Sequence, residues 1–186
     1  MQGLLYLRVV MSYEVIVIGG SFAGLSAALQ LARSRRRVLV LDSGKPRNRF
    51  AQFSHGLFGH DGYPPSAILA NARSQLLSYG TVSFAEDLAS HAARSGEEYP
   101  VTAASGVVHT ASRLILATGV SDDLSALPGL QERWAVSVLH CFYCHGYEVA
   151  GRRLGVLASN ERALQTAMLS RTGASTLHSL PTVCLP

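Results

Sequence analysis

A glycine-rich turn between an apolar run and a helical pattern limits most strongly how this chain can fold. Residues 15–18 are a continuous β-branched run, which is typical of a strand buried on both faces of a parallel sheet. Glycines follow at once, and from Phe22 apolar residues recur at helical spacing. A second apolar run, residues 38–41, ends on Asp42. These segments predict a strand, a glycine turn, a helix and a second strand, as in an α/β fold.

The turn has the pattern of a dinucleotide-binding fingerprint, with serine where the second glycine is usual. Gly19 permits a sharp turn, and Gly24 lets the helix pack close to the strand. The helix N-terminus offers free N–H groups and a positive dipole to a pyrophosphate, and Asp42 can accept hydrogen bonds from ribose hydroxyls. An ordinary strand–helix turn is the alternative, but the combined context favours dinucleotide binding. The predicted nucleotide contacts are Gly19, Gly20, Ser21, Phe22, Ala23, Gly24 and Asp42.

Composition bounds the class of protein. The chain has 186 residues, enough for one α/β domain or for one domain and an incomplete second. Hydrophobic residues make up 48% and charged residues 15%, which favours a folded globular protein. The net charge of +4 comes from scattered arginines without a nucleic-acid-binding motif, so no nucleic-acid partner is predicted. Three cysteines do not make a disulfide framework, and no apolar run is long enough to cross a bilayer; we therefore expect a cytoplasmic protein without a membrane partner.

Further elements follow from hydrophobic period and turn residues. Residues 44–65 form a long irregular stretch, which we interpret as a binding loop because such loops are unusual inside a compact domain. Short strand-like pieces near residues 82–84, 99–101 and 106–108 predict a small antiparallel meander. The remaining expected elements are a helix over residues 67–77, a buried strand over 113–119, a linker over 122–129, a strand over 154–158 and a helix over 163–169.

Cys141 and Cys144 are the second group of residues that indicates chemistry. Two cysteines three residues apart at the start of a helical turn can form a small-loop disulfide, and the helix dipole favours the thiolate. His140 and His145 flank the pair and could accept or donate a proton. Three alternatives stay open: a zinc site completed by the histidines and Cys184, a c-type haem attachment, and two reduced buried cysteines. A redox dithiol without a metal is favoured.

The four motifs, in their order along the chain, resemble thioredoxin-reductase-like flavoproteins of the pyridine nucleotide-disulfide oxidoreductase family. They are residues 19–24, Asp42, the run Ala117, Thr118 and Gly119, and the Cys141/Cys144 pair, and the resemblance covers about residues 13–171. It implies that the first glycine motif binds the FAD pyrophosphate, that Asp42 holds the adenosine ribose and that residues 117–119 close the FAD site. It also implies that the cysteine pair exchanges electrons with the flavin. Asn48 resembles the loop residue that approaches the flavin ring, and the same loop supplies the other predicted cofactor contacts, Arg47, His60 and Asp61.

The chain departs from thioredoxin reductase itself in three ways. The residue after the second cysteine is His145 rather than an acid, which resembles the branch of fungal dithiol oxidases and their bacterial relatives and implies His140 or His145 as the base. Residues 158–163 offer no glycine for a second phosphate turn, so use of NADPH is doubtful. In the family the central domain continues beyond this point and a later segment completes the FAD domain, so we expect a chain that is truncated at its C-terminus.

The sequence thus predicts a Rossmann-like, three-layer FAD-binding α/β domain with a small β-meander over residues 11–119 and a hinge over 120–127. Residues 128–186 are predicted to be the start of a second dinucleotide-binding-like domain that carries the cysteine pair, with an aperiodic tail from Arg171. The predicted function is FAD-dependent thiol/disulfide oxidoreduction on a small dithiol or disulfide or a thioredoxin-like protein, with a homodimer as an open option. The alternative is a non-catalytic nucleotide-binding remnant, or a partner of a full-length relative.

Overall fold

The computed structural model describes residues 12–124, 127–157, 168 and 176–180. The chain divides into two compact units. One contains the residues up to Arg49 and Ser66–Asp122, and the other contains Phe50–Pro65 and the residues from Asp123 onward. The chain therefore passes from one unit to the other three times.

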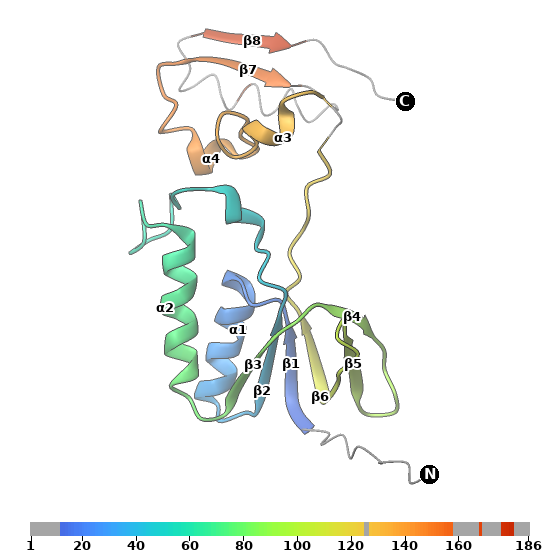
Figure 1. Ribbon diagram of the computed structural model, residues 1–186. Helices are drawn as coiled ribbons and strands as arrows, with labels where there is room; N and C mark the ends of the chain where they lie inside the picture. The colour runs from blue at the N-terminus through green and yellow to red at the C-terminus, as the bar shows by residue number, and fades with distance from the viewer. Residues whose placement is uncertain (1–11, 125–126, 158–167, 169–175, 181–186) are drawn as a thin grey trace. The chain divides into compact units, whose positions relative to one another are not determined.

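The first unit is built on a six-stranded sheet with the strand order β3-β2-β1-β6-β5-β4 (Figure 1). Its strands are β1 (Ser12–Ile18), β2 (Val38–Asp42), β3 (Val82–Glu86), β4 (Ala89–Ala92), β5 (Tyr99–Ala103) and β6 (Val108–Leu116). The helices are α1 (Phe22–Arg33), the short 3-10 helix η1 (Arg47–Phe50) and α2 (Pro65–Leu77). β1 runs parallel to β2 and β6, β2 runs parallel to β3, and β4, β5 and β6 form an antiparallel meander. The predicted α/β fold with a meander is confirmed.

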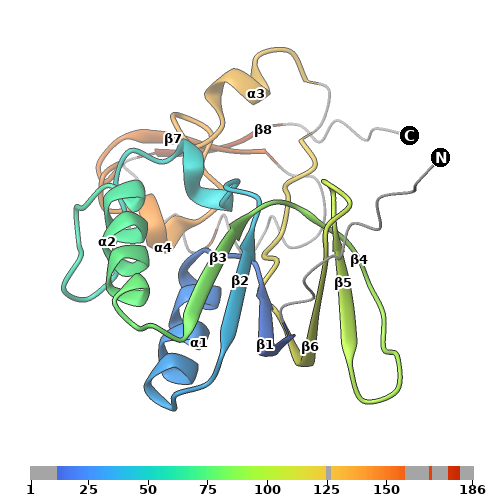
Figure 2. The ribbon, with the colours of Figure 1, turned by 60° about the horizontal axis from the view of Figure 1, so that its bottom comes forward.

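Alternate residues of β1 and β2 face opposite layers, as a strand with two buried faces requires. Val15, Val17, Val38 and Val40 pack in one cluster with residues of α1 and α2, which lie on one side of the sheet (Figure 2). Ile16, Leu39 and Leu41 pack on the other side with residues of the meander. All seven side chains are at most 4% exposed, and each contributes about 1.5–3 kcal/mol of burial free energy. This double layer holds the carboxyl ends of the parallel strands in fixed positions.

Three expected strands differ from those in the structure. The piece expected near residues 106–108 is not a separate strand, because only its last residue, Val108, is in a strand, as the first residue of β6. Residues 82–84 belong to β3, a parallel neighbour of β2, and not to the meander, because the preceding helix α2 returns the chain for a parallel crossover. The strand expected over residues 113–119 begins earlier, at Val108, and ends at Leu116, which is 69% exposed. β5 pairs only with residues 108–111, so the later residues of β6 have one neighbouring strand, β1.

The second unit contains α3 (Leu130–Arg133), α4 (Phe142–His145), β7 (Arg153–Leu157) and β8 (Thr176–Leu180). β7 and β8 pair in parallel. The tail after Arg171 was expected to lack regular structure, but β8 lies within it, because backbone pairing with β7 does not depend on a side-chain period. The helix expected over residues 163–169 lies outside the described residues, except for the helical Met168. In the part of the chain that the structure describes, no helix is long and apolar enough to span a membrane.

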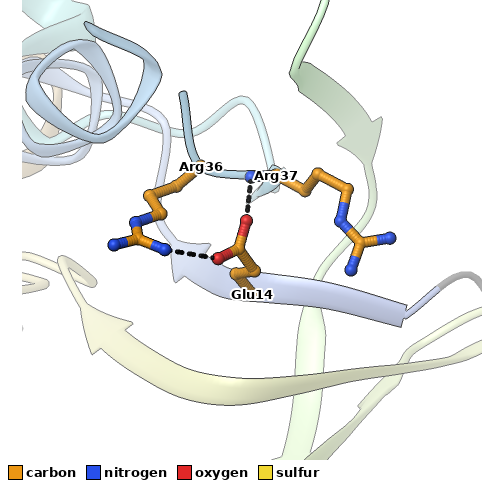
Figure 3. Close-up of polar contacts among 3 residues, drawn as sticks. All are labelled: Glu14, Arg36 and Arg37. Atoms are coloured by element: carbon orange, nitrogen blue, oxygen red, sulfur yellow. Dashed lines mark hydrogen bonds and ion pairs between the residues drawn. The ribbon is translucent and has the colours of Figure 1, made fainter. Parts of the chain in front are cut away.

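Glu14 joins the start of β1 to the turn before β2, at the end of the sheet away from the glycine turn (Figure 3). Its carboxylate accepts hydrogen bonds from the Arg37 backbone N–H at 2.9 Å and from the Arg36 guanidinium at 2.9 Å. The Arg37 N–H and then Arg36 lower the pKa of Glu14 below its ordinary value. A lowered folded-state pKa adds stability above the unfolded-state pKa, and this stability is lost as the pH falls through the folded-state value.

We therefore expect Glu14→Gln to lower the midpoint of thermal unfolding at neutral pH, since a neutral amide makes weaker hydrogen bonds to Arg36 and Arg37. The difference from the wild type should shrink as the pH falls below the ordinary range of Glu. The exposed Glu97 offers a matched control, and Glu97→Gln should leave the midpoint unchanged. Equal midpoints for both variants at neutral pH would show that the Glu14 contacts contribute nothing.

Candidate functional site

The glycine turn after β1 leaves no room for side chains at its first and last positions. Gly19 has a φ of +103°, and a Cβ there would lie 2.2 Å from the Ala117 carbonyl oxygen. A Cβ on Gly24 would lie 1.8 Å from the Gly19 carbonyl oxygen. Both clashes are with backbone, which cannot rotate away. The turn therefore packs as closely as a glycine permits against Ala117, the residue that follows β6.

The first turn of α1 keeps its backbone donors available. Ser21 is the N-cap residue, but its side chain makes no capping hydrogen bond. The first N–H groups of a helix have no partner within the helix, and the aligned peptide dipoles make this end positive. Phe22 and Ala23 supply the first N–H groups of α1. The end of α1 beside Gly19 and Gly20 can thus bind a phosphate without a basic side chain.

Asp42 holds the glycine turn from the neighbouring strand β2. The Gly20 N–H donates a 3.0 Å hydrogen bond to Asp42 Oδ1. A Cβ on Gly20 would lie 2.8 Å from both Cβ and Cγ of Asp42, so this glycine too is needed for the close approach. Oδ2 is left to accept a hydrogen bond from a ligand hydroxyl.

A cavity of about 360 Å³ opens beside Asp42, at the carboxyl ends of β2 and β3. Ligand sites in open α/β sheets lie at this edge. A hydrogen bond from Ser105 lowers the pKa of Asp87 in the lining, so that carboxylate is charged at neutral pH. The lining residues are Asp42, Ser43, Gly44, Lys45, Arg73, Glu86, Asp87 and Leu88. Sequence reasoning missed Arg73, which lies in α2, and it missed Glu86 and Asp87, at and just after the end of β3, because it assigned residues 82–84 of that strand to the meander.

Arg47 is paired within the protein. Its Nε donates a 2.8 Å hydrogen bond to Asp122 Oδ2, and its Nη2 donates to Asp122 Oδ1. The hydrogen bond that Arg47 donates to the Asp122 carboxylate raises the pKa of Arg47 above its ordinary value. Asn48 follows in η1 and is half-buried, whereas Thr118 and Gly119 after β6 are exposed. The predicted contacts of Arg47, Asn48, Thr118 and Gly119 with a cofactor stay predictions.

Cys141 and Cys144 form a disulfide at the start of α4, with their Cα atoms 5.4 Å apart. Cys141 is the N-cap residue, and its Sγ accepts a 3.3 Å hydrogen bond from the Cys144 N–H. Both cysteines are half-buried, so the disulfide is partly accessible. His145 is the last residue of α4, and His140 stacks on Trp134 with ring centroids 5.8 Å apart.

The zinc alternative finds no support among the described residues, where no three His, Cys, Asp or Glu side chains are placed to hold a metal ion. The disulfide removes two thiolates that such a site would need. Cys184 lies outside the described residues.

His55 is a residue that sequence reasoning did not single out. Its Nδ1 lies 3.3 Å from Glu148 Oε1 and 3.7 Å from Asp61 Oδ1, and Asp61 also accepts a 2.8 Å hydrogen bond from the Gly56 N–H. His60 packs edge-on against Tyr63. These contacts tie residues 54–63 to the turn after α4 within the second unit. Asp61 thus orders its own loop, and a cofactor contact of His60 or Asp61 stays a prediction.

Comparison with known proteins identifies the relatives of this arrangement. Residues 13–152 match the family model described as pyridine nucleotide-disulphide oxidoreductase. A thioredoxin reductase of Claviceps purpurea is 38% identical over 148 residues, which cover 78% of this chain and 46% of that protein. An oxidoreductase from Agrobacterium tumefaciens is similar in structure, with a TM-score of 0.89 and 44% identity over 95% of this chain and 60% of that one. For a putative thioredoxin reductase from Bacillus anthracis the TM-score is 0.86 and the identity 27%, over 90% of this chain and 56% of that one. The chain spans about half the length of the curated relatives that it matches.

Proposed function

Because this chain belongs to the pyridine nucleotide-disulphide oxidoreductase family, among its thioredoxin-reductase-like members, we propose that it binds FAD and exchanges electrons with a dithiol through Cys141 and Cys144. The observation that carries the proposal is the Cys141–Cys144 disulfide at the start of α4, half-buried and beside two histidines. A disulfide of this kind is the oxidised half of a thiol/disulfide exchange couple.

The first unit fits the ADP portion of FAD. The turn at Gly19, Gly20 and Gly24 has room for backbone only, and the uncapped start of α1 adjoins it; these features would hold the pyrophosphate. Asp42 Oδ2 would accept from the adenosine ribose, and the cavity beside it has a volume suited to a small ligand. FAD, when bound, takes up or supplies the two electrons that the cysteine pair exchanges.

The exchange itself needs only groups of this chain and the substrate. A substrate thiolate attacks one sulfur of the Cys141–Cys144 disulfide, which forms a mixed disulfide and releases the other cysteine as a thiolate. The second substrate thiolate then attacks the substrate sulfur of the mixed disulfide. The substrate leaves as a disulfide and both cysteines are reduced, so two electrons have passed to the pair. His140 or His145 would accept a proton from a thiol, because only thiolates attack.

The remaining parts of the proposal rest on the sequence and the relatives. We propose residues 11–119 as the FAD-binding domain, 120–127 as the hinge and 128–186 as part of the domain that carries the cysteine pair. The substrate class is a small dithiol or disulfide, or a thioredoxin-like protein, and a homodimer in the cytoplasm is the proposed state. NADPH is not proposed as the electron donor. Residues 158–163, which lie outside the described residues, contain no glycine for a second phosphate turn, and Glu161 adds a negative charge to that segment.

The test is to purify the full chain and identify its flavin, then mix it anaerobically with dithiothreitol or with NADPH. We expect chromatography of the released cofactor to give FAD. The glycine turn would bind a pyrophosphate and Asp42 an adenosine ribose, and FMN has neither group. Dithiothreitol should bleach the flavin absorbance quickly, and NADPH should not. Recovery of FMN alone, or equally fast bleaching by NADPH, would contradict the proposal. Bound FAD that no dithiol reduces would instead support the non-catalytic remnant.

A further inference from the structure

Arg47 and Asp122 form a two-point contact between segments that are far apart in the chain. The fork of the guanidinium meets both carboxylate oxygens, with the Nε–Oδ2 distance at 2.8 Å, across a sequence separation of 75 residues. The side chains are 39% and 22% exposed, so water screens the pair only in part. A bidentate arginine–carboxylate pair fixes the distance between two groups and also their relative orientation.

The pair joins two segments that carry predicted contacts to the cofactor. Arg47 is the first residue of η1, which contains Asn48. Asp122 follows the turn of Ala117, Thr118 and Gly119 at the end of β6. Both partners also lie where the chain leaves the first unit, which ends at Arg49 and at Asp122.

We propose that Arg47 and Asp122 are a positioning pair that holds η1 against the segment that follows β6 before the cofactor arrives, and that this raises the affinity of the chain for FAD. The inference rests on the proposed function. Without the pair, binding would have to order the η1 segment, and that ordering would subtract from the affinity. Asp122 already holds two donors of Arg47 and neutralises its charge, so the pair acts through position and not as a phosphate anchor.

Arg47 could position η1 or bind a phosphate directly, and the two roles predict opposite effects of Asp122→Asn on the affinity for FAD. If Arg47 positions η1 through Asp122, Arg47→Gln and Asp122→Asn should each weaken FAD binding by about fivefold to tenfold, and the double variant should be no weaker than either. If Arg47 binds a phosphate directly, Asp122→Asn should strengthen FAD binding, because it removes a negative charge. Arg47→Lys should resemble Arg47→Gln, since lysine cannot form the fork. The neighbouring exposed Asp123 is the matched control, and Asp123→Asn should bind FAD like the wild type.

Hydrogen–deuterium exchange of the flavin-free chain tests the pair independently of FAD. Amides of residues 45–50 and 119–124 should exchange about fivefold to tenfold faster in Arg47→Lys and in Asp122→Asn than in the wild type and in Asp123→Asn. Unchanged exchange in these segments, or additive losses of FAD affinity in the double variant, would overturn the positioning role. If neither the wild type nor any variant binds flavin, the proposed function fails. Faster amide exchange in the variants would still show that the Arg47–Asp122 pair holds the two segments in place.

Discussion

Serine in place of Cys141 or Cys144 is expected to slow the reduction of bound flavin by a dithiol by a factor on the order of 10³ or more. Either substitution removes the disulfide that the substrate thiolate attacks, and a serine hydroxyl cannot take its place. The losses should not add in the double variant, because both cysteines act as one unit. Anaerobic stopped-flow mixing with dithiothreitol measures the rate.

Cys184→Ser is the matched control, since it removes a thiol of the same chain outside the pair. It should reduce as fast as the wild type. Alkylation followed by mass spectrometry reads the disulfide without any flavin: Cys141 and Cys144 should be protected together until dithiothreitol is added, and Cys141→Ser should leave Cys144 open to alkylation. A serine variant that still reduces at the wild-type rate would refute the exchange mechanism. A stoichiometric zinc atom in the purified protein would instead revive the metal alternative.

The parts of the fold that the sequence predicts well are those specified by neighbouring residues. The run of residues 15–18, the turn from Gly19 to Gly24 and the second run ending at Asp42 each have a local pattern, and the structure places them in β1, α1 and β2. Cys141 and Cys144 likewise needed only their spacing and the helical turn between them. Local propensity and tertiary packing favour the same structure at these places, so the local sequence pattern is enough to predict the element.

The parts that the sequence did not predict depend on partners far along the chain. β3 has the composition of a meander strand, and only its pairing with β2 places Glu86 and Asp87 beside Asp42. Arg47 stands in a loop that resembles a cofactor loop, yet its partner Asp122 is 75 residues away. His55 and Glu148 are similarly remote. No pattern of neighbouring residues encodes such pairs, because the sheet and the crossovers bring them together.

Alanine at Gly24 is expected to lower the free energy of unfolding by about 3 kcal/mol, at the upper end of the usual cost of overpacking. Helix propensity alone predicts the opposite sign for this change in the free energy of unfolding. Gly24 lies in the first turn of α1, and in an unobstructed helix a change from glycine to alanine stabilises by up to about 1 kcal/mol. Here the new Cβ would meet the Gly19 carbonyl oxygen at 1.8 Å and its carbon at 2.9 Å. To relieve the clash, α1 must move away from β1.

Gly80 provides the matched control, because a Cβ there meets nothing within 4 Å and its backbone is not in the left-handed region. Gly80→Ala should leave the midpoint of urea unfolding unchanged or raise it slightly. Gly44→Ala adds a second comparison: its surroundings are also open but its φ is +70°, so it should cost only the backbone strain of about 1–2 kcal/mol.

The three variants separate steric contact from backbone strain, and Gly24→Ala also tests the cofactor site through the position of α1. A shift of α1 away from β1 would carry the N–H groups at its start away from the place where Gly19 and Gly20 turn toward Asp42. Gly24→Ala should therefore weaken FAD binding even in conditions where the variant stays folded, whereas Gly80→Ala should not. If Gly24→Ala proved as stable as Gly80→Ala and bound FAD equally well, the close packing of α1 on the glycine turn would have no part in binding the cofactor.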